Sequence, residues 1–356
     1  MPGGFCGVLN NHSCMKIPKD RFTLREASMT IKKYLVTGGT GFIGSALVKR
    51  LVKDGHRVRV LDNDIRGAAE RLKDVKDKVE LFNADIRNVK EVQEACKGID
   101  SVIHLAYING TEYFYKMPEL VLEVGVKGMM NVIDGCIKEN VKELVLASSS
   151  EAYQTPEKIP TDESAKLSIP DPLNPRYSYG GGKIISELLA INYGRKHFNR
   201  VLIFRPHNVY GPDMGWEHVI PQFVLRMKGL CKDTKDEKIK FPIQGTGKET
   251  RAFVFIDDFI DGLMLMLEKG RHMNVYHIGT MEEISIEQAA IMVGKYFARE
   301  VEIVSGEEAK GGTNRRCPDI SKLKKLGYNP KVSFAEGLKK TAKWYDENAD
   351  KVQKIK

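Results

Sequence analysis

A tyrosine and a lysine stand four residues apart, on either side of three consecutive glycines. In the segment Tyr179-Gly-Gly-Gly-Lys183, this spacing places the phenol and the ammonium on one face of a helix, where they can act together. A phenol has an ordinary pKa of about 10 and is a poor base at neutral pH, but an adjacent ammonium lowers that pKa. The pair therefore predicts proton removal from a hydroxyl group. Glycine costs about 1 kcal/mol relative to alanine inside a helix, which indicates that another group approaches the backbone closely there.

A serine-rich segment follows a buried strand upstream of this pair. The apolar run that ends at Ala147 is followed by Ser148, Ser149, Ser150 and Glu151. Serines after a strand ordinarily form turns, but in a parallel α/β sheet the carboxyl ends of the strands line the ligand crevice. We therefore expect this segment to face a ligand. Glu151 is either an acid/base group there, a solvated carboxylate or a local cap.

A glycine-rich loop near the start of the chain has the spacing expected of a dinucleotide site. Gly38, Gly41 and Gly44 follow a short β-branched run and precede a helical pattern. A tight turn, close approach of a pyrophosphate to the backbone, and packing of a helix on a sheet each require a residue without Cβ. The helix N-terminus then presents its partial positive charge to the phosphates. The loop predicts a nicotinamide dinucleotide, whose oxidised ring would also favour the Tyr179 phenolate.

Two aspartates bear on which dinucleotide binds. Asp62 ends the second strand, 18 residues after Gly44, where its carboxylate can accept hydrogen bonds from the adenosine ribose hydroxyls and repel a 2′-phosphate. This favours NAD over NADP, although Arg66 is placed to receive such a phosphate. Asp85 follows the third strand and is expected to meet the adenine amino group, the alternative being a helix N-cap.

Short β-branched runs alternate with longer amphipathic segments and indicate the fold class. The strand candidates are Lys33 to Thr37, Arg57 to Leu61, Val79 to Asn83, Ser101 to Leu105, Glu143 to Ala147 and Arg200 to Phe204. Strict alternation of strand and helix predicts an α/β fold with a doubly wound parallel Rossmann sheet. After residue 206, prolines and glycines interrupt this rhythm and predict a smaller C-terminal α/β substrate-binding lobe with helices at 283–296 and 334–345.

These patterns divide the chain into four parts. We expect a flexible N-terminal tail at 1–28 and an NAD-binding Rossmann domain at 29–206. Residues 207–346 are expected to form mainly the substrate-binding lobe, with some segments returning to the Rossmann domain. A basic tail at 347–356 would end the chain.

The net charge of +9 lies mainly at the two ends of the chain. Residues 1–33 carry six basic and two acidic side chains, and residues 339–356 carry six and three. The body is close to neutral, so we expect no nucleic-acid partner. No apolar run approaches the ~20 residues that cross a bilayer, so we expect no membrane partner either. The six cysteines show no C-x-x-C pair and no metal-ligand spacing, which predicts no metal site and a cytoplasmic location with reduced thiols.

In combination, these motifs resemble the extended short-chain dehydrogenase/reductase family of nucleotide-sugar epimerases, dehydratases and decarboxylases. The resemblance covers residues 32 to about 346. Three further segments contribute to it: Arg205-Pro-His-Asn-Val-Tyr-Gly-Pro212, Gly247-Lys-Glu-Thr-Arg-Ala-Phe253 and Arg315-Arg-Cys-Pro-Asp-Ile320. It implies an NAD-dependent enzyme, a nucleotide-diphosphate sugar as substrate, and a homodimer built from helices near 119–138 and 175–197.

The resemblance also implies roles for individual residues. Tyr179 would take a proton from a sugar hydroxyl, while Lys183 would hold the nicotinamide ribose and lower the tyrosine pKa. Ser149 falls at the family's hydroxyl-bonding position, and Glu151 at a candidate acid/base position. The residues expected to bind the substrate diphosphate, unless they form surface ion pairs, are Asn208, Arg251, Arg315 and Arg316. The expected NAD-binding residues are Gly38, Gly41, Phe42, Ile43, Gly44, Asp62, Asn63, Asp85, Ile86, Leu105, Ala106, Tyr107, Tyr179 and Lys183.

Two positions depart from the family pattern. Gly125 stands where relatives usually carry an asparagine near the cofactor, and Gln154 stands where a glycine normally follows the tyrosine. Neither departure removes a catalytic group, but both argue against copying the pocket of any one relative.

Oxidation of a sugar at C4 gives a ketone whose neighbours become acidic, so one first step leads to several reactions. Returning the hydride to the other face gives 4-epimerisation, which needs only Ser149, Tyr179 and Lys183. Removal of the C5 proton and loss of the C6 hydroxyl gives 4,6-dehydration, and a β-keto acid loses carbon dioxide. The segment 149–151 slightly favours dehydration, with 4-epimerisation next and decarboxylation third, although 250–253 and 316–320 resemble the decarboxylase pattern.

Two other functions agree less well with the sequence. A reductase of a small ketone would have no need of Asn208 and Arg251, because its substrate has no diphosphate. A catalytically silent NAD-binding scaffold would have no need to retain Ser149, Tyr179 and Lys183.

Overall fold

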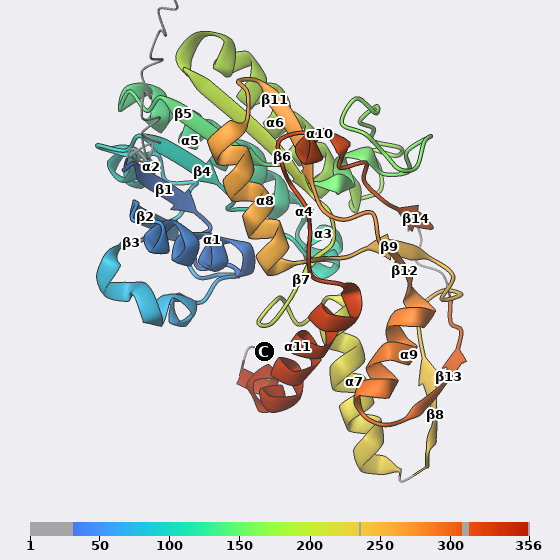
Figure 1. Cartoon of the computed structure of the whole chain (residues 1–356). Helices are drawn as coiled ribbons and strands as arrows, with labels where there is room; N and C mark the ends of the chain where they lie inside the picture. The colour runs from blue at the N-terminus through green and yellow to red at the C-terminus, as the bar shows by residue number, and fades with distance from the viewer. Residues whose placement is uncertain (1–30, 235, 308–312, 355–356) are drawn as a thin grey trace, which may run out of the picture. The chain divides into compact units, whose positions relative to one another are not determined.

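The computed structural model describes residues 31–234, 236–307 and 313–354. Within these residues a parallel sheet of seven strands runs in the order β11-β6-β5-β4-β1-β2-β3 (Figure 1). Its strands are β1 (Lys33–Thr37), β2 (Arg57–Asp62), β3 (Val79–Asn83), β4 (Ser101–His104), β5 (Glu143–Ala147), β6 (Arg200–Pro206) and β11 (Asn274–Ile278). The chain order reverses between β1 and β4, which is the switch point of a doubly wound sheet. The predicted fold class is therefore confirmed, while the predicted tail at 1–28 lies outside the described residues.

Helices cover both faces of this sheet. Alternate residues of a strand point to opposite faces, so in β1 Val36 packs in the core beneath α1 and α8 and Leu35 packs in the core beneath α2, α5 and α6. The helices are α1 (Phe42–Lys53), α2 (Val89–Cys96), α5 (Gly128–Lys138), α6 (Tyr177–His197) and α8 (Ile256–Lys269). Because both faces are covered, β4 and β5 are buried along their whole length.

Shorter elements connect the sheet to its helices. They are the 3-10 segments Ala69–Lys78 and Ser150–Tyr153, the helices α3 (Thr111–Lys116) and α4 (Pro118–Leu122), and a π-helical turn at Glu123–Lys127. The turn at Ser150–Tyr153 begins directly after β5 and carries the serine-rich segment over the carboxyl edge of the sheet. This placement is where the sequence predicted the serine-rich segment to face a ligand, and the segment lines the cavity described below.

The rest of the C-terminal half adds small sheets and three longer helices. The helices are α7 (Val219–Asp233), α9 (Ile286–Tyr296) and α11 (Phe334–Glu347), with a short α10 (Ser321–Lys324) and a 3-10 turn at Ala349–Lys354. The strands are β7 (Val209–Tyr210), β8 (Lys238–Pro242), β9 (Thr250–Ala252), β10 (Val254–Phe255), β12 (Glu283–Ser285), β13 (Glu300–Val304) and β14 (Arg315–Arg316). The helix predicted at 283–296 starts only at Ile286, because residues 283–285 pair with β9 and Ser285 caps the helix.

Two elements from beyond residue 206 belong to the large sheet. β11 pairs in parallel with β6, and α8 lies on the same face as α1. The boundaries drawn at residues 206 and 346 stay a prediction. In the part of the chain that the structure describes, no helix is both long and apolar enough to span a membrane.

Candidate active site

The glycine-rich loop between β1 and α1 excludes side chains at two positions. Gly38 has a positive φ of 73°, and a Cβ there would lie 2.7 Å from the backbone nitrogen of Ala106. A Cβ on Gly44 would overlap the carbonyl oxygen of Gly38. Gly41 precedes α1 without a side-chain cap, so the first amides of the helix remain available to an anion. The loop therefore has the backbone geometry that a pyrophosphate requires.

One cavity of about 820 Å³ runs from this loop to the serine-rich segment. It is lined by every residue expected to bind NAD: Gly38, Gly41, Phe42, Ile43, Gly44, Asp62, Asn63, Asp85, Ile86, Leu105, Ala106, Tyr107, Tyr179 and Lys183. Ser149, Glu151, Asn208 and Arg316 line the same cavity. The residues present therefore fit a dinucleotide that lies across the carboxyl edge of the sheet and reaches Tyr179.

Asp62 anchors the loop at the end of β2. Its carboxylate accepts hydrogen bonds from the backbone N–H groups of Thr40 and Asp64, both at 3.0 Å. Arg66, the residue that could have received a 2′-phosphate, lies 3.4 Å from a carboxylate oxygen of Glu217. This ion pair partly neutralises Arg66, so the charges of Asp62 and Arg66 continue to favour NAD.

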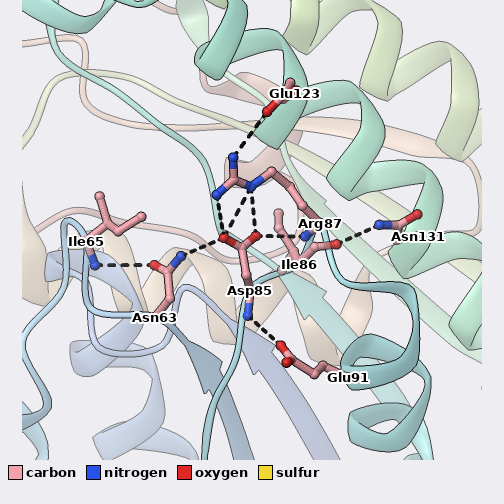
Figure 2. A network of polar contacts seen from close by, with 8 residues as sticks. All are labelled: Asn63, Ile65, Asp85, Ile86, Arg87, Glu91, Glu123 and Asn131. Carbon is pink, nitrogen blue, oxygen red and sulfur yellow. Dashed lines mark hydrogen bonds and ion pairs between the residues drawn. The ribbon is translucent and has the colours of Figure 1, made fainter.

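Asp85 lines the cavity and lies at the centre of a polar network (Figure 2). Arg87 donates to its carboxylate at 2.7 Å through Nη2, and Asn63 donates through Nδ2 at 3.1 Å. The hydrogen bonds of Arg87 hold the pKa of Asp85 below its usual range, although burial opposes the effect. Asn88 rather than Asp85 caps α2, so the helix-cap alternative for Asp85 does not apply. Asp85 is thus held as an ionised acceptor, and Arg87 also reaches Glu123 at 3.1 Å.

Tyr179 and Lys183 lie on one face of α6 and both are buried. Burial raises the pKa of the Tyr179 phenol to about 12, and hydrogen bonding by Ser149 opposes this rise. The charges that act on the phenol are those of Glu151, which raises its pKa, and Arg316, which lowers it. The Lys183 ammonium instead donates to the carbonyl of Ala147 at 2.7 Å. The phenol is therefore neutral in the protein alone.

The three glycines before Lys183 are in contact with other parts of the protein. A Cβ on Gly180 would overlap the Gln154 amide, and one on Gly182 would overlap the hydroxyl of Tyr107. Gln154 itself has a positive φ of 55°, a conformation that explains why a glycine is usual at that position. The close approach expected at these glycines is thus made by neighbouring side chains.

Glu151 lies at the far end of the cavity among arginines. Arg316 donates to Oε1 of Glu151 at 2.5 Å. Burial alone would raise the pKa of Glu151, but the charge and hydrogen bond of Arg316, together with the charges of Arg176 and Arg251, bring it below the usual range. Glu151 is therefore a carboxylate that a single strong ion pair holds in place.

The four residues expected to bind the diphosphate occupy different environments. Arg316 is buried and lines the cavity, as does Asn208, whose buried Nδ2 has no partner among the described residues. Burial lowers the pKa of Arg251 to about 10, and Arg316 adds to the effect, but Arg251 is not part of the cavity wall. Arg315 is half exposed and pairs with Glu283 at 2.6 Å.

Residues 34–279 match the family model described as the NAD dependent epimerase/dehydratase family. The chain belongs to this family. It is 31% identical over 317 residues to UDP-glucuronic acid decarboxylase 1 of Xenopus tropicalis, covering 88% of this chain and 72% of that protein. It is 33% identical over 316 residues to UDP-glucuronic acid decarboxylase 6 of Arabidopsis thaliana, covering 86% of each.

Solved structures show the same likeness. The dTDP-glucose 4,6-dehydratase of Streptomyces venezuelae with NAD bound superposes with a TM-score of 0.80 at 29% identity, covering 91% of this chain and 100% of that chain. The UDP-glucose 4-epimerase of Thermotoga maritima gives 0.78 at 28% identity, covering 89% and 99%. The resemblance to the extended short-chain dehydrogenase/reductases is thus confirmed, and this chain is an NAD-dependent enzyme of the nucleotide-sugar epimerase, dehydratase and decarboxylase group.

Sequence reasoning missed one residue of the site. Arg176 stands at the N-cap of α6, one helical turn before Tyr179, and lines the cavity with a buried Nε that has no partner among the described residues. The signal was its three-residue spacing from Tyr179, which places both on one face of the helix. Arg176 adds a third positive charge around Glu151.

Proposed function

We propose that this enzyme decarboxylates a nucleotide-bound sugar acid through a 4-keto-sugar intermediate. The observation that carries the proposal is the set of arginines whose charges act on Glu151: Arg316 and Arg176, which line the cavity, and Arg251, which lies outside its wall. Three guanidinium groups exceed what one carboxylate neutralises, and guanidinium forks match carboxylate oxygens. A substrate carboxylate at C6 would supply the second negative charge.

The same cluster makes 4,6-dehydration less favoured than the sequence suggested. Dehydration needs a base for the C5 proton and an acid for the departing C6 hydroxyl. The segment 148–153 contains one carboxylate, Glu151, and the residue before it is Ser150. A serine hydroxyl is too weak an acid to protonate the departing C6 hydroxyl, so the segment offers one acid/base group where dehydration needs two. The low pKa of Glu151 also makes it a weak base. Decarboxylation needs no such base, because the C5–C6 bond breaks instead of the C5–H bond.

The chain's own groups suit the proton transfer at C4 and the binding of the sugar carboxylate in such a reaction. NAD, when bound, supplies the positively charged nicotinamide that accepts the C4 hydride and later returns it. Tyr179 takes the proton of the C4 hydroxyl, with Ser149 hydrogen-bonded beside it. Arg316 and Arg176 hold the C6 carboxylate. When the C5–C6 bond breaks, its electron pair moves towards the C4 ketone, carbon dioxide leaves, and C5 takes a proton from solvent.

The curated relatives support the proposal, since those quoted above carry the name UDP-glucuronic acid decarboxylase. Asn208 lies in the cavity wall where its unpaired amide can donate to the substrate diphosphate. We therefore propose UDP-glucuronic acid, or a close analogue, as the substrate. Arg315 is left out of the proposed site because it faces Glu283.

Mass spectrometry of products tests the proposal. The protein with NAD is incubated in heavy water with UDP-glucuronic acid and, separately, with UDP-, GDP-, CDP- and dTDP-hexoses. Loss of carbon dioxide from the sugar acid, with one deuterium gained at C5, is the expected result. Loss of water from a hexose would establish dehydration instead, and an unchanged mass with altered C4 configuration would establish 4-epimerisation.

We also propose a homodimer in the cytoplasm. The helices expected to form the interface expose apolar side chains at Leu122, Ile185 and Leu188, and an apolar face of this kind favours a second copy of the chain. The described cysteines, Cys96, Cys136, Cys231 and Cys317, are free thiols, in keeping with a reducing compartment.

A further inference from the structure

Tyr107 follows β4 and lies between two elements that carry the active site. Its hydroxyl occupies the space that a Cβ on Gly125 or on Gly182 would fill. Gly125 belongs to the π-helical turn Glu123–Lys127, and Gly182 belongs to α6. The absence of side chains at both positions therefore forms a seat for this one phenol.

The hydroxyl of Tyr107 makes no polar contact with the described residues that surround it. It is buried and has no hydrogen-bond partner among the described residues, and burial raises its pKa well above its usual range. An unpaired buried hydroxyl weakens a fold rather than stabilising it. Among the described residues, the polar contacts of Tyr107 are made by its aromatic ring and not by its hydroxyl.

The ring of Tyr107 lies beneath the catalytic lysine. The Lys183 ammonium is 3.9 Å from its centroid, a distance typical of a cation–π contact. The same ring meets that of Tyr179 edge to face, with centroids 5.0 Å apart. One side chain thus contacts both members of the tyrosine–lysine pair.

From this geometry we propose that Tyr107 is a positioning residue that holds Lys183 in place and in its charged form through the face of its ring. Within the described part of the chain the ammonium has one hydrogen bond, to the Ala147 carbonyl, and a buried ammonium needs further electrostatic support. The electron-rich face of an aromatic ring supplies such support without itself carrying a charge.

The charged groups near Lys183 do not fully offset the effect of burial on its ammonium, so the ring of Tyr107 contributes to stabilising the charged form. Burial lowers the pKa of Lys183 to about 7, and the carboxylate of Glu187, one turn further along α6, acts against that decrease. His104 of β4 is also nearby, but burial lowers its pKa to about 3, so it is neutral at physiological pH. Because the Lys183 pKa lies close to neutrality, a modest stabilising contact decides how much of the lysine is charged.

Fluorination of the ring at residue 107 tests this without changing its shape. Phenylalanine, 4-fluorophenylalanine and trifluorophenylalanine are incorporated there, which progressively removes electron density from the ring face. The Lys183 pKa is read in the NAD-free protein from the ¹³Cε signal of labelled lysine, assigned by its loss in Lys183→Arg. We expect the pKa to fall along the series by about one pKa unit in all, a tenfold loss of proton affinity.

Phe114 provides a matched control for the fluorination series. Its ring stacks on Tyr179 with centroids 5.1 Å apart, so fluorination there alters the aromatic environment of the tyrosine without altering the ring beneath Lys183. We expect no change in the Lys183 pKa from this control. A constant Lys183 pKa across the residue 107 series, or an equal decrease from residue 114, would refute the proposal.

The rate profile gives a second readout. If the lysine must be charged, the increase of kcat/KM with pH, which comes from ionisation of Tyr179, ends at the Lys183 pKa, and a lower Lys183 pKa moves this break to lower pH. A merely structural role for Tyr107 would lower kcat/KM equally at every pH. The proposal requires only that Lys183 acts in catalysis, so its failure would leave the proposed decarboxylation intact, and the product masses test that separately.

Discussion

Arg316 of β14 reaches across 165 positions of sequence to place its guanidinium Nη1 2.5 Å from Oε1 of Glu151, directly after β5. This ion pair joins the C-terminal half of the chain to the serine-rich edge of the large sheet. It holds the carboxylate of the serine-rich segment in its charged form. The pair thus sets the electrostatic character of the end of the cavity that contains the serine-rich segment.

Replacing Arg316 tests the role of this pair. Arg316→Met is expected to lower turnover of UDP-glucuronic acid by roughly 10²-fold or more, because it removes a substrate contact and leaves Glu151 without its partner. Steady-state kinetics measure the effect. Arg315→Met is the control: that side chain is half exposed and pairs with Glu283, so kcat/KM should stay within about twofold of wild type. Equal losses in both variants would contradict a specific role for Arg316.

Tyr179→Phe is expected to retain NAD binding but to lose turnover by about 10²-fold or more, as for removal of a general base. Tyr177→Phe, two residues earlier on α6 and outside the cavity lining, should behave like wild type. In the wild-type protein burial raises the phenol pKa to about 12. Since the base form is the phenolate, kcat/KM should rise with pH on the acidic side of the profile. Near-normal turnover of Tyr179→Phe would remove Tyr179 from the mechanism.

Asp62→Ala is expected to weaken NAD binding by roughly 10-fold or more, as for loss of hydrogen bonds to a charged group. NADP binding should weaken less, because the same change removes the carboxylate that repels a 2′-phosphate. Isothermal titration calorimetry with both dinucleotides gives the ratio. An equal loss of both affinities would mean that Asp62 acts only on the loop, through Thr40 and Asp64.

A methyl group at Gly125 is expected to destabilise the protein by about 1–3 kcal/mol, because it would overlap Tyr107. In a Tyr107→Ala background the added cost of Gly125→Ala should largely disappear, since the overlapping side chain is gone. Gly229→Ala is the control: it lies within α7, and nothing stands within 4 Å of its Cβ position. That change should stabilise the protein by up to about 1 kcal/mol. Urea unfolding gives the free energy of unfolding of Gly125→Ala, Tyr107→Ala, the double variant and Gly229→Ala. If Gly125→Ala lowers this free energy equally with and without the Tyr107 side chain, the overlap with Tyr107 is not the cause.

A charge on the exposed apolar face of α6 is expected to disrupt the proposed dimer. Leu188→Glu should shift the protein to a monomer at micromolar concentration, because an unpaired carboxylate would be buried at the interface. Leu81→Glu on β3 is a control with similar exposure, 47% against 55% for Leu188. Sedimentation velocity distinguishes the two, and a monomeric wild-type protein would refute the dimer outright.

The central strands could be predicted from sequence because a strand that is buried on both faces consists mainly of apolar residues. β1, β3 and β5 coincide with their predicted ranges. β1 and β5 are covered on both faces and are therefore apolar along most of their length, whereas β3 is a largely exposed edge strand. The start of α9 was misplaced by three residues. Residues 283–285 pair with β9, far away in the sequence, and local periodicity carries no record of such pairing.

The site was predictable as a set of residues but not as a set of contacts. Arg315 and Arg316 are neighbours with the same side chain, yet only Arg316 faces the cavity. Adjacent residues of a strand point to opposite sides, so the two roles depend on β14 being a strand. That strand exists only through its pairing with β9. The contact of Lys183 with Tyr107 likewise joins two elements 76 positions apart.

β11 lies beyond residue 206 in the chain but belongs to the large sheet, so the first 206 residues do not contain the whole sheet. Because β11 covers the outer side of β6, a fragment that stops near residue 206 would leave β6 as an open edge, with the apolar run 201–204 at its centre. Such an edge is a template for intermolecular pairing. Truncation at this point should therefore produce aggregates, and a soluble N-terminal half would have to retain β11 by circular permutation or by a grafted strand.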